Sequence, residues 1–309
     1  MNSAACCSCV RDRPIIKQRR DWTLTVDTKH NAPPEKDDTL DEDRILLIEI
    51  SGKTVGANLD AAIAAGHVVE RPDGKFELRH RSKQPYIGNH REFGPCCEFL
   101  NDFVFTHIYG KGTVPIGCRD CYKVKVTPDS LRQLMAVKEV AEGFACSSKS
   151  GSEVDKSNTQ SLYASYFYLL GLDKARTVYK RLRGLIDAHP KLGPSVKMVI
   201  KRGCTNYEHA CGPSDQYTFD PQLADVESYF WRRFVRKKSA MQKPHREALT
   251  LLSLARIAYR IGDDTYKDFT GGKDLFPPTV SYDPNDPAIA GDDAAPEGKT
   301  ASDDHSISR

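Results

Sequence analysis

The segment Cys118-Arg119-Asp120-Cys121 carries the clearest chemical signal in this chain. Two cysteines separated by two residues can bind one metal ion from the same side of a tight turn, and structural zinc sites commonly contain such a pair. Gly117 directly before the pair permits the turn, and Lys123 shortly after it supplies positive charge that would offset thiolate charge. The segment therefore predicts a cysteine-rich metal-binding knuckle.

A tetrahedral site needs two further ligands, and Cys204 and Cys211 bracket a polar loop that could supply them. We expect the metal to be held by Cys118, Cys121, Cys204 and Cys211, with Cys97 as the first reserve ligand. Structural zinc is the expected metal. A four-cysteine set also suits an iron–sulfur cluster, which is the alternative cofactor. The competing interpretation is a set of buried free thiols, since cysteine is among the most buried residue types.

A metal- or thiol-dependent enzyme is the alternative function. Cys146 lies three residues before Lys149, whose charge would lower the pKa of a nearby thiol. Glu208 and His209 are candidates for acid and base roles beside a metal. The segment Ser51–Thr54 resembles the end of a phosphate-binding loop but lacks the glycine that should precede it. No complete catalytic motif is present, so the sequence leaves open both the substrate and whether the protein is an enzyme.

Positive charge is concentrated in two segments of the C-terminal half. Residues 174–202 contain nine lysines and arginines and one acidic residue, Asp187, whereas residues 229–246 contain seven and no acid. Aromatic residues alternate with cations in the second segment, a pattern that could neutralise phosphates while rings stack on bases. In the competing interpretation, Trp231 and Phe234 form an aromatic stripe that faces the core. The first functional hypothesis is therefore a metal-binding protein that binds nucleic acid or another polyanion through these basic segments.

The two ends of the chain differ in composition from its middle. The first forty residues hold a proline pair and a run of charges, and the last thirty are acidic and rich in proline. Such segments bury too little apolar surface to offset the entropy cost of ordering. We expect a flexible leader over residues 1–40, one globular domain with the metal site over 41–276, and a disordered acidic tail over 277–309.

Composition restricts the cellular setting. The net charge of +3 is too small to indicate nucleic-acid binding by itself, and no apolar stretch approaches the roughly 20 residues that a membrane-spanning helix needs. The N-terminus lacks the apolar segment of a secretory signal. We therefore expect a cytoplasmic protein without a membrane partner, in which the ten cysteines are thiols or metal ligands rather than disulfides. The oligomeric state is left open.

The hydrophobic patterning predicts an α+β fold with a mostly helical C-terminal half and short strands around the cysteine-rich knuckle. The expected helices cover residues 58–65, 129–141, 162–170, 173–188, 222–236 and 246–261. The expected strands cover residues 67–70 and 75–78, which form a hairpin, and residues 103–105, 124–126 and 196–200. An interhelical loop is expected over residues 146–152.

Overall fold

The computed structural model describes residues 42–79, 85–89, 96–236, 242–280 and 282. The predicted leader over 1–40 and most of the predicted acidic tail lie outside these residues, as do Cys6, Cys7 and Cys9. The described residues mix helices and strands, which confirms the α+β class. None of the helices in the described ranges has the length and apolar character needed to cross a lipid bilayer.

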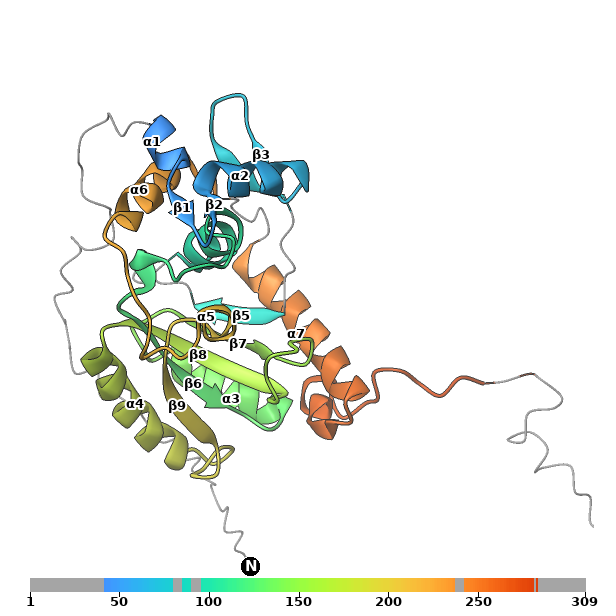
Figure 1. Cartoon of the computed structure of the whole chain (residues 1–309). Coiled ribbons are helices and arrows are strands. Elements are labelled where there is room, and N and C mark those ends of the chain that lie inside the picture. The colour runs from blue at the N-terminus through green and yellow to red at the C-terminus, as the bar shows by residue number, and fades with distance from the viewer. Residues whose placement is uncertain (1–41, 80–84, 90–95, 237–241, 281, 283–309) are drawn as a thin grey trace, which may run out of the picture.

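The helices and strands of the protein are labelled in chain order in Figure 1. They are α1 (Glu42–Leu46), β1 (Glu49–Ile50), β2 (Lys53–Thr54), α2 (Val55–Ala64), β3 (Val68–Glu70), β4 (Phe76–Leu78), β5 (Tyr86–Asn89), the π-helix η2 (Glu98–Ile108), the 3-10 helix η3 (Ile116–Cys118), β6 (Cys121–Thr127), α3 (Leu131–Ala141), β7 (Ser148–Ser152), β8 (Tyr163–Leu170), α4 (Leu172–Asp187), β9 (Lys197–Arg202), α5 (Thr205–Cys211), α6 (Leu223–Arg233), α7 (Lys243–Arg260) and the 3-10 helix η4 (Asp264–Phe269).

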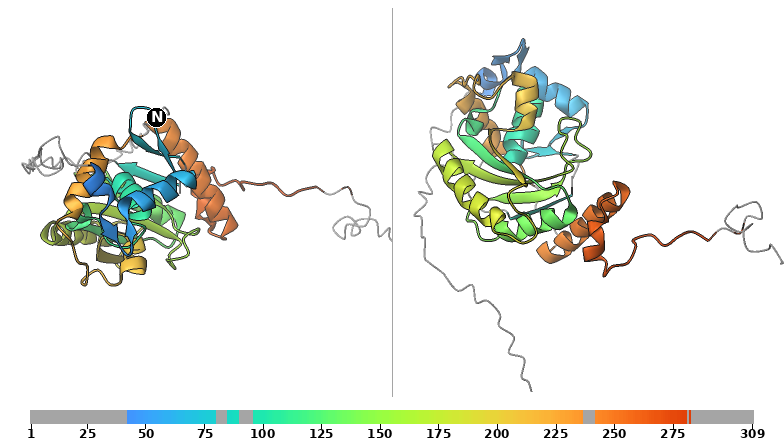
Figure 2. Two further views of the ribbon diagram at one scale, coloured as in Figure 1. Left: turned by 45° about the horizontal axis from the view of Figure 1, so that its top comes forward. Right: turned by 90° about the horizontal axis from the view of Figure 1, so that it is seen from below.

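A five-stranded antiparallel sheet forms the centre of the fold, with the strand order β5-β7-β8-β6-β9. In the middle of this sheet Val124 of β6 lies between Phe167 of β8 and Ile200 of β9. Helices α3 and α4 cover the face that carries these three residues, and Val137 and Leu182 are fully buried against it (Figures 1 and 2). One face of the sheet therefore packs into an apolar core under α3 and α4, and the opposite face carries the other side chains of the same strands.

A second core lies beside the sheet and is rich in aromatic rings. It joins α2, η2, α6 and the β3–β4 hairpin, and Phe103 of η2 is fully buried at its centre. The Phe103 ring lies 5.6 Å from Phe230 of α6 and 6.3 Å from Phe76 of β4, measured between centroids. Figure 1 shows α1, α2 and α6 gathered at the end of the molecule above the sheet. This core positions the segment that carries Cys118, because Cys118 and Cys121 pack into it.

Several elements form where the sequence predicts them, and their local signals are visible. Ser130 caps α3 by accepting a hydrogen bond from the backbone nitrogen of Gln133 at 3.3 Å. The predicted hairpin forms as β3 and β4, with Gly74 at a φ of +71° in its turn. The helices expected over 58–65, 173–188, 222–236 and 246–261, and the strand expected over 196–200, also form within a few residues of their predicted ends.

Three predictions of local structure are wrong. Residues 162–170 were expected to be a helix but form the central strand β8, because a strand buried on both faces has no polar alternation to mark it. Residues 103–105 were expected to be a strand but lie inside η2, where the surrounding aromatic core decides the conformation. Residues 146–152 were expected to be a loop, but residues 148–152 form β7 despite their small polar side chains.

The β5–β7 pairing depends on a residue without a side chain. A Cβ atom at Gly151 of β7 would overlap the carbonyl oxygen of Pro85 and the ring of Tyr86 in β5. We predict that Gly151→Ala lowers the free energy of unfolding by roughly 1–3 kcal/mol, since β5 must move to make room. Gly184→Ala is the matched control, because Gly184 has open space around it within α4 and alanine favours a helix. Urea denaturation measures both variants, and equal stability of the two would contradict this account.

Candidate functional site

The face of the sheet opposite α3 and α4 is rich in lysine. Because successive side chains of a strand point to opposite faces, Lys123 and Lys125 of β6 share the face that Val124 does not occupy. Tyr166 of β8 pairs with Lys125 on one side and with Lys149 of β7 on the other. The register therefore brings three lysines and one tyrosine from three neighbouring strands together, and we call this group with Lys156 the lysine cluster.

Four ammonium groups surround the ring of Tyr166. Their Nζ atoms lie 5.2 Å (Lys123), 5.9 Å (Lys125), 5.5 Å (Lys149) and 5.7 Å (Lys156) from the ring centroid. A cation within about 6 Å of an aromatic centroid is attracted by the negative face of the ring. That attraction offsets part of the repulsion between four like charges, so the ring is the structural centre of the lysine cluster.

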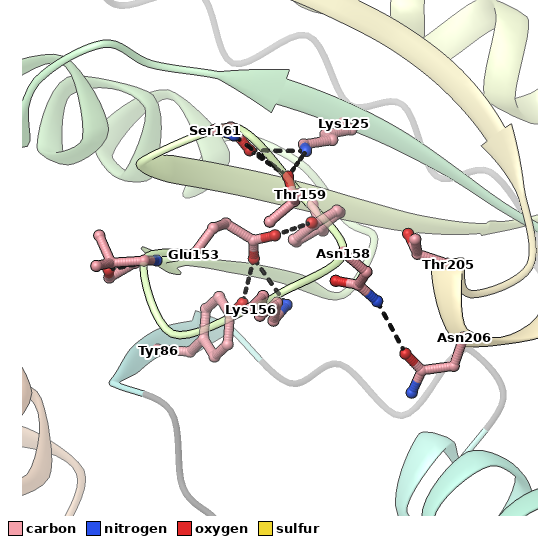
Figure 3. Close-up of polar contacts among 12 residues, drawn as sticks. Tyr86, Lys125, Glu153, Lys156, Asn158, Thr159, Ser161, Thr205 and Asn206 are labelled. Carbon is pink, nitrogen blue, oxygen red and sulfur yellow. Dashed lines mark hydrogen bonds and ion pairs between the residues drawn. The ribbon is translucent and has the colours of Figure 1, made fainter. Parts of the chain in front are cut away.

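Glu153 contributes a carboxylate to this group, and Glu153 is 2% exposed. It accepts hydrogen bonds from the Tyr86 hydroxyl and, at 2.9 Å, from the Tyr166 hydroxyl, and it forms an ion pair with Lys156 at 2.8 Å (Figure 3). Burial by itself raises the pKa of the Glu153 carboxyl, but the hydrogen bonds from Lys156, Tyr86 and Tyr166 outweigh burial and hold this pKa below its usual value. Glu153 is therefore ionised at neutral pH.

Polar side chains of the β7–β8 connection lie at the edge of the lysine cluster. The ammonium group of Lys125 donates to the Ser161 hydroxyl at 2.9 Å and to the Thr159 hydroxyl at 3.4 Å. The side-chain amide of Asn158 donates to the side-chain oxygen of Asn206 in α5 at 3.2 Å. Figure 3 shows these hydroxyl and amide groups on the same side of the sheet as Glu153. At this edge of the lysine cluster, neutral hydroxyl and amide groups therefore lie beside the charged Lys125.

Lys201 of β9 extends the positive charge to a fifth residue. It lies opposite Lys123 in the β6–β9 pairing, and its ammonium group contacts Glu208 of α5 at 2.5 Å. Glu208, predicted as a candidate acid or base, forms this ion pair at the end of the sheet, and its acid–base role stays a prediction.

Positive charge exceeds negative charge on this face. Glu153 pairs with Lys156 and Glu208 pairs with Lys201, whereas no carboxylate of the described residues lies within 4 Å of the ammonium groups of Lys123, Lys125 and Lys149. Lys123 is only 6% exposed. Gathering cations away from water costs free energy unless anions compensate them. The arrangement is therefore suited to receive an anion.

The predicted metal ligands divide into a group of four and one separate residue. The backbone nitrogen of Gly203 donates to the carbonyl oxygen of Cys121 at 2.8 Å, so Cys204 lies beside the start of β6. Burial is the main cause that raises the pKa of Cys97, Cys118 and Cys121, and the charge of the neighbouring Cys204 thiolate raises all three further. We call Cys97, Cys118, Cys121 and Cys204 the thiol group.

Cys211 does not join the thiol group. Its Sγ atom lies 3.7 Å from the carbonyl oxygen of Lys111, and burial is the one cause that raises its pKa. Within the described residues, no three or more His, Cys, Asp or Glu side chains converge closely enough to hold a metal ion, and no knuckle with a complete ligand set is formed. Zinc or iron–sulfur binding stays a prediction. None of the seven described cysteines forms a disulfide with another described residue.

The other residues predicted as catalytic candidates are Cys146 and His209, and the cysteines of the thiol group are possible nucleophiles. Cys146 packs at the edge of the core under α3 and α4. The raised pKa values of Cys97, Cys118 and Cys121 lower their thiolate fractions at neutral pH, which disfavours them as nucleophiles. His209 lies in the last turn of α5.

The two basic segments use much of their charge within the protein. Arg183 of α4 donates to the carbonyl oxygen of Val196 at 2.6 Å, and Arg202 of β9 donates to that of Arg119 at 2.9 Å. Trp231 and Phe234 pack against the aromatic core, which confirms the core-facing interpretation of that stripe. Lys237 and Lys238 lie outside the described residues. From these segments, Lys201 is the residue that reaches the lysine cluster.

Sequence reasoning did not identify the lysine cluster, although one signal was present. Lys123 and Lys125 alternate with valines in a predicted strand, and Tyr166 and Tyr168 alternate in β8. Alternation of long cations with apolar residues marks a strand with one apolar face and one charged face. The pairing of β8 with both β6 and β7 could not be read from this alternation, because β8 was expected to be a helix.

Searches of protein-family models, of curated proteins and of solved structures each found no match to this chain.

A second buried carboxylate holds the segment that carries Cys118. Glu227 of α6 is 7% exposed and accepts hydrogen bonds from the backbone nitrogens of Ile116 at 2.6 Å and Gly117 at 2.9 Å, and from the Tyr109 hydroxyl at 3.0 Å. Burial raises the pKa of this carboxyl to about 7, although the three hydrogen bonds oppose the increase.

The raised pKa of Glu227 predicts a pH-dependent stability. The folded state binds a proton more tightly than the unfolded state, so the contribution of Glu227 to stability is greatest below the unfolded pKa and is lost as pH rises toward 7. Between pH 5 and 8, we expect the stability of the wild type relative to Glu227→Gln to fall by on the order of 2 kcal/mol. Urea denaturation at both pH values measures this difference, and a difference that does not change with pH would refute the assignment.

Proposed function

We propose that this protein binds an anionic ligand, a nucleic-acid strand or another polyanion, through the lysine-rich face of its five-stranded sheet. The observation that carries the proposal is the gathering of four ammonium groups around the Tyr166 ring with one buried carboxylate among them. Phosphate groups are the anions that clustered lysines and hydroxyls commonly bind in proteins. The ligand would supply the negative charge that the protein leaves uncompensated.

The site has an outer and an inner part, which suits a ligand that enters from the edge. The partly exposed ammonium groups of Lys156 and Lys201 lie at the outer part, together with Lys125 and its hydroxyl partner Ser161. Charges at such an edge attract a polyanion from solution, and the attraction weakens as salt concentration rises. Lys123 in the inner part is more buried, so its charge acts through a lower dielectric and is felt more strongly by a bound phosphate.

Binding of a fluorescent single-stranded oligonucleotide, and its displacement by inorganic polyphosphate, tests the proposal. We expect Lys125→Gln to weaken binding about tenfold and to lower the salt dependence by about one released counterion, because one phosphate contact is lost. Fluorescence anisotropy over a series of salt concentrations measures both quantities.

Lys180→Gln is the matched control for this experiment. Lys180 is exposed on α4, which covers the opposite face of the sheet, and it belongs to the basic segment 174–202 predicted from the sequence. We expect Lys180→Gln to bind like the wild type. A loss of binding in Lys180→Gln with normal binding in Lys125→Gln would move the site to α4, and absence of binding to both polyanions by the wild type would reject the proposal.

We also propose that the thiol group binds a metal ion, with zinc as the first candidate and an iron–sulfur cluster as the alternative. The supporting observation is the backbone hydrogen bond from Gly203 to Cys121, which draws Cys204 toward the pair Cys118 and Cys121. Cys97 then replaces Cys211 as the fourth ligand. Four thiolates would need the side chains to converge further on binding, as metal-coupled ordering of a site allows.

Elemental analysis and a visible absorption spectrum of protein purified without oxygen test the metal proposal. We expect about one zinc per chain for a single tetrahedral site. The metal should be lost in Cys121→Ala and retained in Cys211→Ala, because Cys211 lies apart from the thiol group. A brown chromophore with iron would select the iron–sulfur alternative, and protein without metal would rule out both.

A further inference from the structure

Lys149 has surroundings unlike those of the other lysines in the lysine cluster. Its Nζ atom lies 4.4 Å from the ring centroid of Tyr86, 5.5 Å from that of Tyr166 and 5.8 Å from that of Tyr168. Lys125 donates to hydroxyls and Lys156 pairs with Glu153, whereas no described residue accepts a hydrogen bond from the Lys149 ammonium group. The amine therefore lies among three aromatic rings without a polar partner in the described part of the chain.

These surroundings favour the neutral amine. Burial lowers the pKa of Lys149 most, and the charges of Lys156 and Lys123 lower it further, against the opposite influence of the thiolate forms of Cys97 and Cys204. A lysine that is desolvated and close to other cations is the type that acts as a nucleophile toward carbonyl groups.

We propose that Lys149 forms a Schiff base with the carbonyl group of an anionic substrate, a phosphorylated or carboxylated aldehyde or ketone. This inference rests on the anion-binding function proposed above and assigns the substrate class of the same site. Lys123 and Lys125 would bind the phosphate or carboxylate group, while the amine between the tyrosine rings meets the carbonyl carbon.

The reaction needs no external oxidant or reductant. The Nζ lone pair attacks the carbonyl carbon, the electrons of the C=O double bond move to oxygen, and a proton passes from nitrogen to oxygen to give a carbinolamine. The C–O bond then breaks, the oxygen leaves with a second proton as water, and the C=N double bond forms. Lys156 and the hydroxyl of Tyr86 are bonded to Glu153 beside Lys149, and this network can supply and recover the proton that the departing oxygen takes.

Pyridoxal 5′-phosphate is the probe for this inference, because it carries an aldehyde and a phosphate in one small molecule. The full chain is incubated with the probe at neutral pH, reduced with borohydride, and digested for peptide mass spectrometry. We expect Lys149 to be labelled several-fold faster than the exposed Lys180, since a lowered pKa gives the Lys149 amine a larger neutral fraction. Inorganic phosphate should slow the labelling of Lys149 and leave that of Lys180 unchanged.

Two variants separate failure of this inference from failure of the anion-binding proposal. Lys149→Arg cannot form a Schiff base, so it should lose the adduct at position 149 and keep that of the exposed Lys180, while oligonucleotide binding by the wild type tests the anion-binding proposal separately. Lys125→Gln keeps the amine and should slow its labelling several-fold, because one contact to the phosphate is lost.

Normal oligonucleotide binding with Lys149 labelled no faster than Lys180 would overturn the Schiff-base inference and leave anion binding intact. Fast labelling of Lys149 that phosphate does not slow would overturn the assignment of an anionic substrate.

Discussion

The antiparallel pairing of β8 with both β6 and β7 is the constraint on which the rest of the structure depends. It places Tyr166 between Lys125 and Lys149, and the alternation of side chains along β6 then adds Lys123 to the same face. The same register sends Val124 and Phe167 to the other face, where α3 and α4 bury them. One pattern of backbone hydrogen bonds thus forms an apolar core on one side of the sheet and a concentration of positive charge on the other, and a shift of one residue would exchange the two faces.

Keeping several ammonium groups together is unfavourable, and the surroundings of the lysine cluster show how the protein reduces that cost. Aromatic rings contribute their negative faces, Glu153 contributes an ionised carboxylate, and the hydroxyls of Ser161 and Thr159 bond to Lys125. The compensation is incomplete for Lys123 and Lys149 among the described residues. A fold optimised only for stability would replace such cations with apolar residues, since buried charges rarely contribute net stability. Their presence supports the proposal that this face binds an anion, because binding an anion needs positive charge.

Local signals in the sequence predict local features of the fold, and they fail where long-range pairing decides. The Ser130 cap, the Gly74 turn and the helix over 173–188 each depend on neighbours in the sequence and are predicted correctly. The strand β8 is buried on both faces by partners from other parts of the chain, so its uniform apolar and aromatic composition does not separate it from a helix.

The candidate site follows the same division. Cys118 and Cys121 stand out because their spacing is local, and Cys204 and Cys211 were expected as further metal ligands, although no such ligand group converges within the described residues. The lysine cluster combines residues 123 to 156 through sheet pairing, and Tyr86 joins from a strand that the sequence did not mark. The basic segment 174–202 drew attention by its composition, yet Arg183 and Arg202 bond to backbone carbonyl oxygens of the protein itself. The concentrated positive charge of segment 174–202 is partly used in hydrogen bonds within the protein. The lysines of the candidate site, in contrast, come from several separate parts of the sequence.

The most direct test of the central claim is to locate a phosphate-like anion on the protein by crystallography with tungstate, whose anomalous scattering identifies its position without ambiguity. The account predicts a tungstate ion within hydrogen-bonding distance of the ammonium groups of Lys123, Lys125 or Lys149, on the face of the sheet opposite α3 and α4. Tungstate bound along α4 with none near Tyr166, or no bound ion at all, would contradict the account.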